Sequence, residues 1–107
     1  MDAPLKGIRV IDWTIWQQGP VATAMLADMG AEVIKIEERE KGDPGRGVFA
    51  IGGAESTRNF YFEANNRHKQ SLTLDLSKPG AWSPIVISAA VPTAISATAA
   101  VMARRLK

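Results

Sequence analysis

The chain has 107 residues, a net charge of +2 at pH 7 and no cysteine. That length suits one small domain, and the lack of cysteine excludes a disulfide framework, a thiolate metal site and a cysteine nucleophile. Positive charge gathers in a terminal stretch with Arg104, Arg105 and Lys107, so it does not indicate a nucleic-acid-binding face. The single histidine, His68, is interpreted as a surface residue, and we expect no metal site.

Two strands joined by a helix are predicted between residues 7 and 37. Residues 8–11 form a short apolar run, which is typical of a strand buried on both faces. Pro20 lies where a helix would begin and Gly30 where a left-handed cap would end it. The β-branched residues within 31–37 predict a second strand, and the short connections favour a parallel βαβ unit.

A long loop and a third strand are predicted in the middle of the chain. Residues 38–59 are rich in glycine and charge, which favours a long surface loop. Aromatic residues 60–62 and a polar cluster at 65–69 follow. The alternating sequence SLTLDL at 71–76 then predicts a strand with its leucines on one face. Ser77 is a possible cap for a following helix.

The last part of the chain changes in character. Residues 84–103 are mostly Ala, Ser, Thr, Val and Ile, interrupted by Pro92. We expect a helix from Thr93, and the alternative is a membrane anchor, which the proline and the weakly apolar residues disfavour. The N-terminal sequence MDAPLKG lacks the features of a secretion signal, so a cytoplasmic location is predicted.

The turn between the first strand and the helix is the predicted functional region, because ligands of α/β folds collect at the carboxyl ends of parallel strands. It holds two amides, Gln17 and Gln18, and one glycine, Gly19. A nicotinamide or flavin cofactor is poorly supported, since its fingerprint needs several glycines here. From the residues alone, a solvated turn and a ligand contact both stay open for the two amides.

Four sequence blocks, in order, also carry a resemblance to a known family. They are PLKGIRVIDWT, QGPVATAMLADMGAEVIKIE, GDPGR and NNRHKQSLTLDL, within residues 4–78. Together they resemble the N-terminal signature of the class III CoA-transferases, the group with formyl-CoA:oxalate CoA-transferase, carnitine CoA-transferase and α-methylacyl-CoA racemase.

With the strand and helix pattern, the resemblance implies an α/β fold. We expect a Rossmann-like βαβ fragment with a short parallel sheet, a long Gly-rich loop and an Ala/Ser/Thr-rich C-terminal tail that is helical in part. The resemblance implies coenzyme A or acyl-CoA as substrate, a carboxylic acid as acceptor, and a homodimer of the full-length protein. In the family an aspartate attacks the acyl-CoA thioester, and such a nucleophile divides one acyl transfer into easier steps.

The resemblance implies roles for six residues near the ends of the predicted strands. They are Gln17, Gln18, Arg39, Leu74, Asp75 and Lys78. A glutamine at the position of Gln17 lies close to the reacting acyl group in the family, which implies a catalytic, oxyanion-stabilising role, with Gln18 beside the CoA. Arg39 would contact the CoA nucleotide, one residue after the family position, where this chain has Glu38. The segment ending at Lys78 would lie along the adenine and phosphates, with Lys78 as the electrostatic partner.

Other residues of the blocks are interpreted as structural. Asp43 and Arg46 are expected to organise their own loop, and Asp12 is expected to support its strand. For Leu74 the alternative to CoA contact is core packing, and for Lys78 it is a solvated lysine.

Two segments follow from these interpretations: residues 1–83 as the N-terminal part of a CoA-transferase large domain, and residues 84–107 as a divergent tail. No position of this chain matches the family's nucleophilic aspartate, which the resemblance implies lies beyond residue 107. The predicted function is therefore a CoA-transferase fragment that retains part of the CoA site and is inactive by itself. The alternative is a small non-catalytic α/β binding or interaction module.

Overall fold

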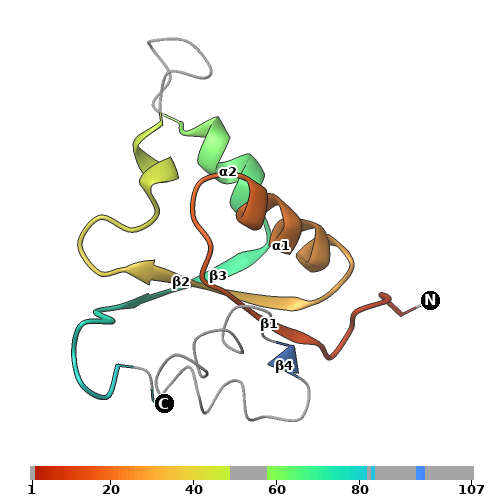
Figure 1. Ribbon diagram of the computed structural model, residues 1–107. Helices are drawn as coiled ribbons and strands as arrows, with labels where there is room; N and C mark the ends of the chain where they lie inside the picture. The colour runs from red at the N-terminus through yellow and green to blue at the C-terminus, as the bar shows by residue number, and fades with distance from the viewer. Residues whose placement is uncertain (1, 49–57, 82, 84–93, 96–107) are drawn as a thin grey trace.

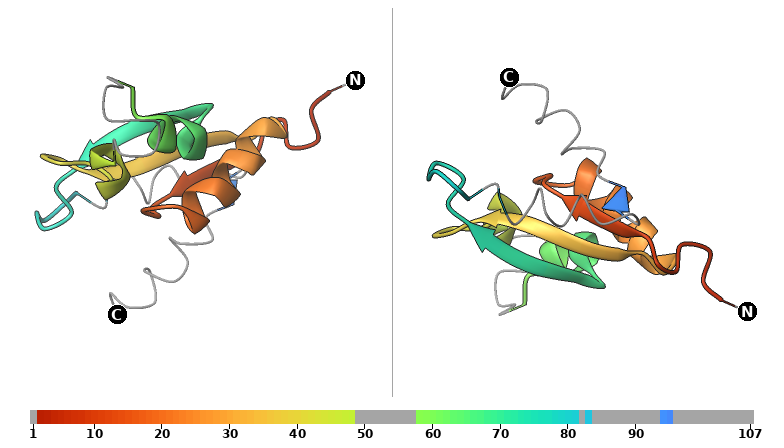
Figure 2. Two further views of the ribbon diagram at one scale, coloured as in Figure 1. Left: turned by 90° about the horizontal axis from the view of Figure 1, so that it is seen from above. Right: turned by 90° about the horizontal axis from the view of Figure 1, so that it is seen from below.

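The computed structural model describes residues 2–48, 58–81, 83 and 94–95. The elements run β1 (Arg9–Asp12), α1 (Gln18–Asp28), β2 (Glu32–Glu38), the 3-10 helix η1 (Pro44–Gly47), α2 (Phe60–Asn66), β3 (Lys69–Leu74) and β4 (Ala94–Ile95). The strands form one parallel sheet in the order β3-β2-β1-β4. Both α-helices lie on the same side of this sheet (Figures 1 and 2). The predicted α/β class and the parallel βαβ unit are confirmed.

The two faces of the sheet differ in the residues that they bury. On the helix-covered face, Val10 and Val33 pack with alanines of α1 and of the loop after it. On the opposite face, Ile11 and Ile36 form a second apolar cluster, with Leu74 packed against it. Side chains alternate between faces along a strand, so these two clusters are separated by the sheet itself.

Helix α1 begins earlier than the sequence predicts. Gln17 is its N-cap and Gln18 its first residue, so Pro20 is the third helical residue and not the first. The first hydrogen bond runs from the backbone N–H of Val21 to the carbonyl oxygen of Gln17. Proline is tolerated here because the first helical N–H groups have no partner within the helix. Gly30, beyond the helix, has φ 97°, which confirms the predicted left-handed cap.

A second helix, α2, lies where the sequence analysis assigned only aromatic and polar residues. Asn59 caps it by accepting a hydrogen bond from the backbone N–H of Phe62 at 2.9 Å. At its far end, Arg67 and His68 both contact the carboxylate of Asp28, the last residue of α1. The exposed position of His68 confirms its interpretation as a surface residue.

Three further boundaries differ from expectation. Strand β3 begins and ends two residues before the predicted segment. Ser77 is not a helix cap, since its N–H and hydroxyl both donate to the carboxylate of Asp75 in a local turn. The predicted loop after β2 contains η1, while its residues 49–57 lie outside the described residues.

The predicted tail helix can be compared with the structure at only two residues. Ala94 and Ile95 form β4, which pairs with β1, so the expectation of helix from Thr93 is wrong there. The rest of the predicted tail helix and of the alternative membrane anchor lies outside the described residues. Within the described ranges, the structure has no helix with both the length and the apolar character needed to cross a bilayer.

Candidate functional site

The turn between β1 and α1 carries the two predicted amides on exposed backbone. Gln17 and Gln18 are exposed, and the side chain of Gln17 makes no capping hydrogen bond. Trp16, directly before them, has φ 69°, an unusual left-handed conformation for a bulky residue. Gly19 fits closely against Thr14, because a Cβ at Gly19 would lie 2.3 Å from the Thr14 Cβ. The turn is therefore tightly formed although its two amides face solvent.

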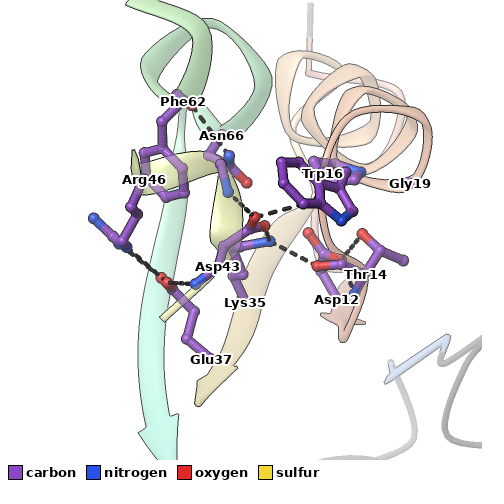
Figure 3. Close-up of polar contacts among 12 residues, drawn as sticks. Asp12, Thr14, Trp16, Gly19, Lys35, Glu37, Asp43, Arg46, Phe62 and Asn66 are labelled. Atoms are coloured by element: carbon purple, nitrogen blue, oxygen red, sulfur yellow. Dashed lines mark hydrogen bonds and ion pairs between the residues drawn. The ribbon is translucent and has the colours of Figure 1, made fainter. Parts of the chain in front are cut away.

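Asp12, at the end of β1, is fully buried and fixes the start of this turn (Figure 3). Its carboxylate accepts hydrogen bonds from the backbone N–H of Thr14 at 2.9 Å, the hydroxyl of Thr23 at 2.7 Å and the ammonium of Lys69 at 2.9 Å. Burial raises the pKa of Asp12, but the bonds from Thr14, Lys69 and Thr23 outweigh it and hold the pKa below its usual value. These contacts support the structural interpretation of Asp12.

A second buried ion pair joins β2 to the segment before η1. The ammonium of Lys35 lies 2.7 Å from Oδ2 of Asp43, and the two side chains are 2% and 1% exposed. Lys35 also donates to the carbonyl oxygen of Thr14 at 2.8 Å. The other oxygen of Asp43 accepts from the backbone N–H groups of Gly45 at 2.8 Å and Trp16 at 3.3 Å. This pair therefore contacts the turn before α1 at two places.

Glu37 completes the buried charges on this face. Two nitrogens of Arg46 donate to its two oxygens, each at 2.7 Å, and Arg46 lies over the ring of Phe62. The backbone N–H of Asp43 and the hydroxyl of Ser71 also donate to Glu37. The bonds from Arg46 lower the pKa of Glu37 to about 2; burial opposes them, and the bonds from Asp43 and Ser71 add to them. Asp43 and Arg46 thus hold their own loop, in agreement with expectation.

A small cavity of about 50 Å³ lies beside these charges. Its walls come from β2, η1, α2 and β3, through Lys35, Glu37, Arg46, Phe62, Asn66, Lys69, Gln70 and Ser71. It has room for a few water molecules and not for a nucleotide. In the part of the chain that the structure describes, no group of three or more potential metal ligands is found.

The predicted site residues fall into two groups along the carboxyl edge of the sheet. Glu38 pairs with Leu74 in register, which places Arg39 and Asp75 next to each other just beyond the strands. Bonds from Ser77 lower the pKa of Asp75, and the charge of Arg39 lowers it further. The backbone of Lys78 bonds that of Asp75.

Gln17 and Gln18 form the second group, after β1. Strand β1 ends opposite Lys35, and β2 continues for three more residues to Glu38. At the usual rise per residue of a strand, the end of β1 lies roughly 10 Å short of the end of β2. The structure therefore places both groups at one edge of the sheet, at different depths.

The sequence analysis missed the buried charges of the central strand. Lys35 and Glu37 lie on one face of β2, and Ile34 and Ile36 lie on the other. Their alternation was a signal: it puts two charged residues on one face of a strand that has neighbours on both sides. Buried charges need partners, so the opposite charges of Asp12, Asp43, Arg46 and Lys69 could have been sought.

Comparisons with known proteins agree on one family. The model of CoA-transferase family III matches residues 5–84. The chain is 44% identical over 80 residues to a succinate–glutarate CoA-transferase of Agrobacterium fabrum, covering 71% of this chain and 20% of that protein. It is 39% identical over 79 residues to a formyl-CoA:oxalate CoA-transferase of Afipia carboxidovorans, covering 74% of this chain and 18% of that protein.

Solved structures with the same fold extend these comparisons. A hypothetical protein from Mycobacterium tuberculosis superposes with a TM-score of 0.71 at 38% identity, over 86% of this chain and 24% of the other. A CAIB/BAIF family protein from Brucella suis superposes with a TM-score of 0.68 at 30% identity, over 79% and 23%. The chain spans about a fifth of the length of the curated relatives that it matches. The match over residues 5–84, most of this chain, shows that the protein belongs to CoA-transferase family III.

Proposed function

We propose that this chain supplies part of the coenzyme A-binding surface of an enzyme that transfers CoA from an acyl-CoA to a carboxylic acid. The observation that carries the proposal is the placement of Arg39, Leu74, Asp75 and Lys78 around the adjoining carboxyl ends of β2 and β3. Ligands of parallel α/β sheets bind at this edge. Two cations at this edge suit the phosphates of CoA, and Leu74, which packs against the cluster of Ile11 and Ile36, would contact the adenine only with the part of its side chain that stays exposed.

The two amides would act at the other end of the same ligand. Gln17 and Gln18 are exposed at the start of α1, where an uncharged N–H donor can bond a thioester carbonyl oxygen. Such a donor stabilises the negative charge that develops on this oxygen when a nucleophile attacks. Because β1 ends well short of β2, the nucleotide and the thioester can occupy different depths of one edge.

We propose further that residues 1–83 form the N-terminal part of a larger domain, that residues 84–107 form a divergent tail, and that the 107-residue chain is inactive by itself. No residue of this chain matches the nucleophilic aspartate implied by the resemblance. The names of two relatives, one for succinate and glutarate and one for formyl-CoA and oxalate, support a carboxylic acid acceptor. A homodimer of the full-length protein and a cytoplasmic location belong to the same proposal.

Calorimetric titration of the purified chain with coenzyme A tests the binding site. We expect measurable binding, weakened about tenfold in Lys78→Ala and in Arg39→Ala, which is typical for loss of one contact to a charged group. Lys6→Ala is the matched control, since Lys6 is an exposed lysine that precedes the amino end of β1. We expect its affinity to equal that of the wild type.

Two outcomes would contradict the proposal. A cooperatively folded chain that does not bind CoA would favour the alternative, a non-catalytic α/β binding or interaction module. Robust CoA transfer by the 107-residue chain, measured as exchange between an acyl-CoA and free carboxylates, would show that the chain contains its own nucleophile.

A further inference from the structure

We propose that the buried Lys35–Asp43 ion pair is a positioning device for Gln17, because it fixes the backbone of the turn from which Gln17 projects. The effect on ligand binding rests on the proposed CoA site, but the positioning of the turn does not. This role is additional to the expected one, in which Asp43 organises its own loop.

The ion pair contacts the turn at Thr14 and at Trp16, the residues on either side of Ile15 (Figure 3). Lys35 donates to the carbonyl oxygen of Thr14 at 2.8 Å, and Asp43 accepts from the backbone N–H of Trp16 at 3.3 Å. Both charged side chains are almost completely buried, at 2% and 1% exposed. Hydrogen bonds to charged groups that are shielded from water are stronger than those between neutral groups. The turn is therefore bonded to two groups that cannot move without breaking a buried ion pair.

The conformation of Trp16 shows why the turn needs such support. Its φ of 69° is disfavoured for a bulky residue and persists only where the surroundings impose it. The Trp16 residue is 50% exposed, so side-chain burial does not impose this conformation. The bond from its backbone N–H to Asp43 acts on Trp16 directly, whereas the bonds to Asp12 reach the turn only at Thr14. Because Trp16 directly precedes Gln17, its backbone angle sets the direction in which the chain, and with it the Gln17 amide, enters α1.

Asp43 is itself held in place from several directions. Its backbone N–H donates to Glu37 at 2.9 Å, and Glu37 is fixed in turn by two bonds from Arg46. Oδ1 of Asp43 also accepts from the N–H of Gly45. A Cβ at Gly45 would lie 3.1 Å from that oxygen and 3.2 Å from the ring of Tyr61, so the loop is closely packed around the carboxylate. The segment before and within η1 thus presents a rigid acceptor to a turn that lies 27 residues earlier in the chain.

Amide hydrogen exchange on the wild-type chain, read by NMR, tests the positioning without any variant. We expect the Trp16 amide to exchange at least about tenfold more slowly than an unstructured amide, since one bond to a buried carboxylate provides that factor. Exchange of Trp16 at the unstructured rate would overturn the proposal.

The variant Asp43→Ala removes the acceptor, and Asp28→Ala is its matched control at the other end of α1, where Asp28 is bonded to Arg67. In Asp43→Ala we expect Trp16 to exchange at close to the rate of an unstructured amide while Val33 in the core stays protected, and Asp43→Asn to restore part of the protection of Trp16. Asp28→Ala should show no such selective loss. If Trp16 still exchanges more slowly than an unstructured amide in folded Asp43→Ala, Asp43 does not hold the turn and the proposal is overturned.

A second variant covers the case in which Asp43→Ala does not fold with Lys35 buried and unpaired. Lys35→Met/Asp43→Ala removes both charges, and we expect the same selective loss at Trp16. Full protection of Trp16 in this variant would overturn the proposal. If neither variant folds, the wild-type exchange of Trp16 decides the question.

Titration with acetyl-CoA, whose thioester has the carbonyl oxygen that free coenzyme A lacks, then tests the link to Gln17. If Asp43 acts through Gln17, Asp43→Ala and Gln17→Ala should each weaken binding, and the double variant should bind no more weakly than the worse single one. Fully additive losses would overturn this link. If the wild-type chain does not bind CoA, the proposed function fails, and amide exchange alone still decides whether Asp43 holds the turn.

Discussion

The two faces of the sheet differ in the kind of side chain that they bury. Opposite to the helices, Ile11 and Ile36 are almost completely buried in an apolar cluster. Under the helices, the same strands bury Val10 and Val33 and, nearer their carboxyl ends, also Asp12, Lys35 and Glu37, each of these three less than 4% exposed; we call this side the charged face. The apolar face gains free energy from burial itself, whereas the charged face needs every partner in place to avoid a large penalty. What the charged face provides in return is directional bonding to the loops that carry the proposed site.

The largest expected effect is on the charged face, in Lys69→Met. The ammonium of Lys69 bonds the carboxylate of Asp12, the carbonyl oxygen of Pro20 and the side chain of Asn66. Its loss leaves a buried carboxylate without its counter-charge, and we expect the free energy of unfolding to fall by about 3–5 kcal/mol. Urea denaturation followed by circular dichroism measures this. The control is Lys6→Met, whose exposed ion pair should matter by less than about 1 kcal/mol.

On the apolar face, Ile36→Ala should lower the free energy of unfolding by about 2–4 kcal/mol, since Ile36 is 2% exposed and leaves a cavity when truncated. Leu72→Ala is the matched control. Leu72 pairs with Ile36 in register on β3, on the same face, but is 38% exposed. We expect less than half the effect in the same denaturation experiment. Equal effects of the two variants would contradict the assignment of Ile36 to a core.

Acidification should destabilise the charged face selectively. The pKa of Glu37 is about 2 in the fold, below its usual 4.5, so the folded state binds this proton less tightly than the unfolded state. Stability from Glu37 is therefore complete above about pH 4.5 and is lost as the pH falls towards 2. The shift in the pKa of Glu37 corresponds to a loss of at most about 3 kcal/mol in the free energy of unfolding. The actual loss should be smaller, because Arg46, the partner of Glu37, is half exposed and solvent screens the interaction.

Denaturation midpoints measured between pH 6 and pH 2 test the role of Glu37. Glu37→Gln should be less stable at pH 6 and should show a shallower decline with acid than the wild type. An unchanged slope in Glu37→Gln would mean that other carboxylates, such as Asp12, dominate the acid response.

The smallest effect concerns the point at which α1 packs onto the turn. Gly19→Ala places a Cβ 2.3 Å from the Cβ of Thr14, an atom that no side-chain rotation can move away. We expect a loss of about 1–3 kcal/mol in stability. Gly47→Ala is the control, because a Cβ at Gly47 meets nothing within 4 Å. Differential scanning calorimetry should show a lower melting temperature for Gly19→Ala alone.

The first half of the fold could be predicted from the sequence because its elements follow local rules. The apolar run of β1, the glycine after α1 and the β-branched residues of β2 each act within a few residues. Helix α2 could not, since its seven residues mix aromatic and polar types without a helical apolar period. It is held by the cap at Asn59 and by contacts with α1 and η1.

The site residues were easier to locate than to connect. The carboxyl ends of parallel strands lie at one edge of a sheet. The placement of Gln17, Arg39 and Lys78 at that edge could therefore be predicted from the parallel βαβ pattern. The start of β3 at Lys69 could not be predicted. A buried lysine is stable there only because its ammonium donates a hydrogen bond to the carboxylate of Asp12, 57 residues away in the sequence. Local patterns cannot contain a bond of that separation. Four different sequence blocks in the right order indicated the family, whereas the bonds that hold the turn join residues far apart in the sequence and are visible only in the structure.

The charges under the helices also protect the sheet against a specific error in assembly. A slip of one residue between β2 and β3 would turn Lys69 and Ser71 toward the apolar face, because alternate side chains point to opposite sides of a strand. Asp12 would then lose its counter-charge, and an ammonium would enter a cluster of isoleucine and leucine. A purely apolar sheet would tolerate such a slip with little cost. Mispaired forms of this sheet are therefore strongly disfavoured. The buried charges specify the strand register because they raise the free energy of the wrong register as well as stabilise the right one.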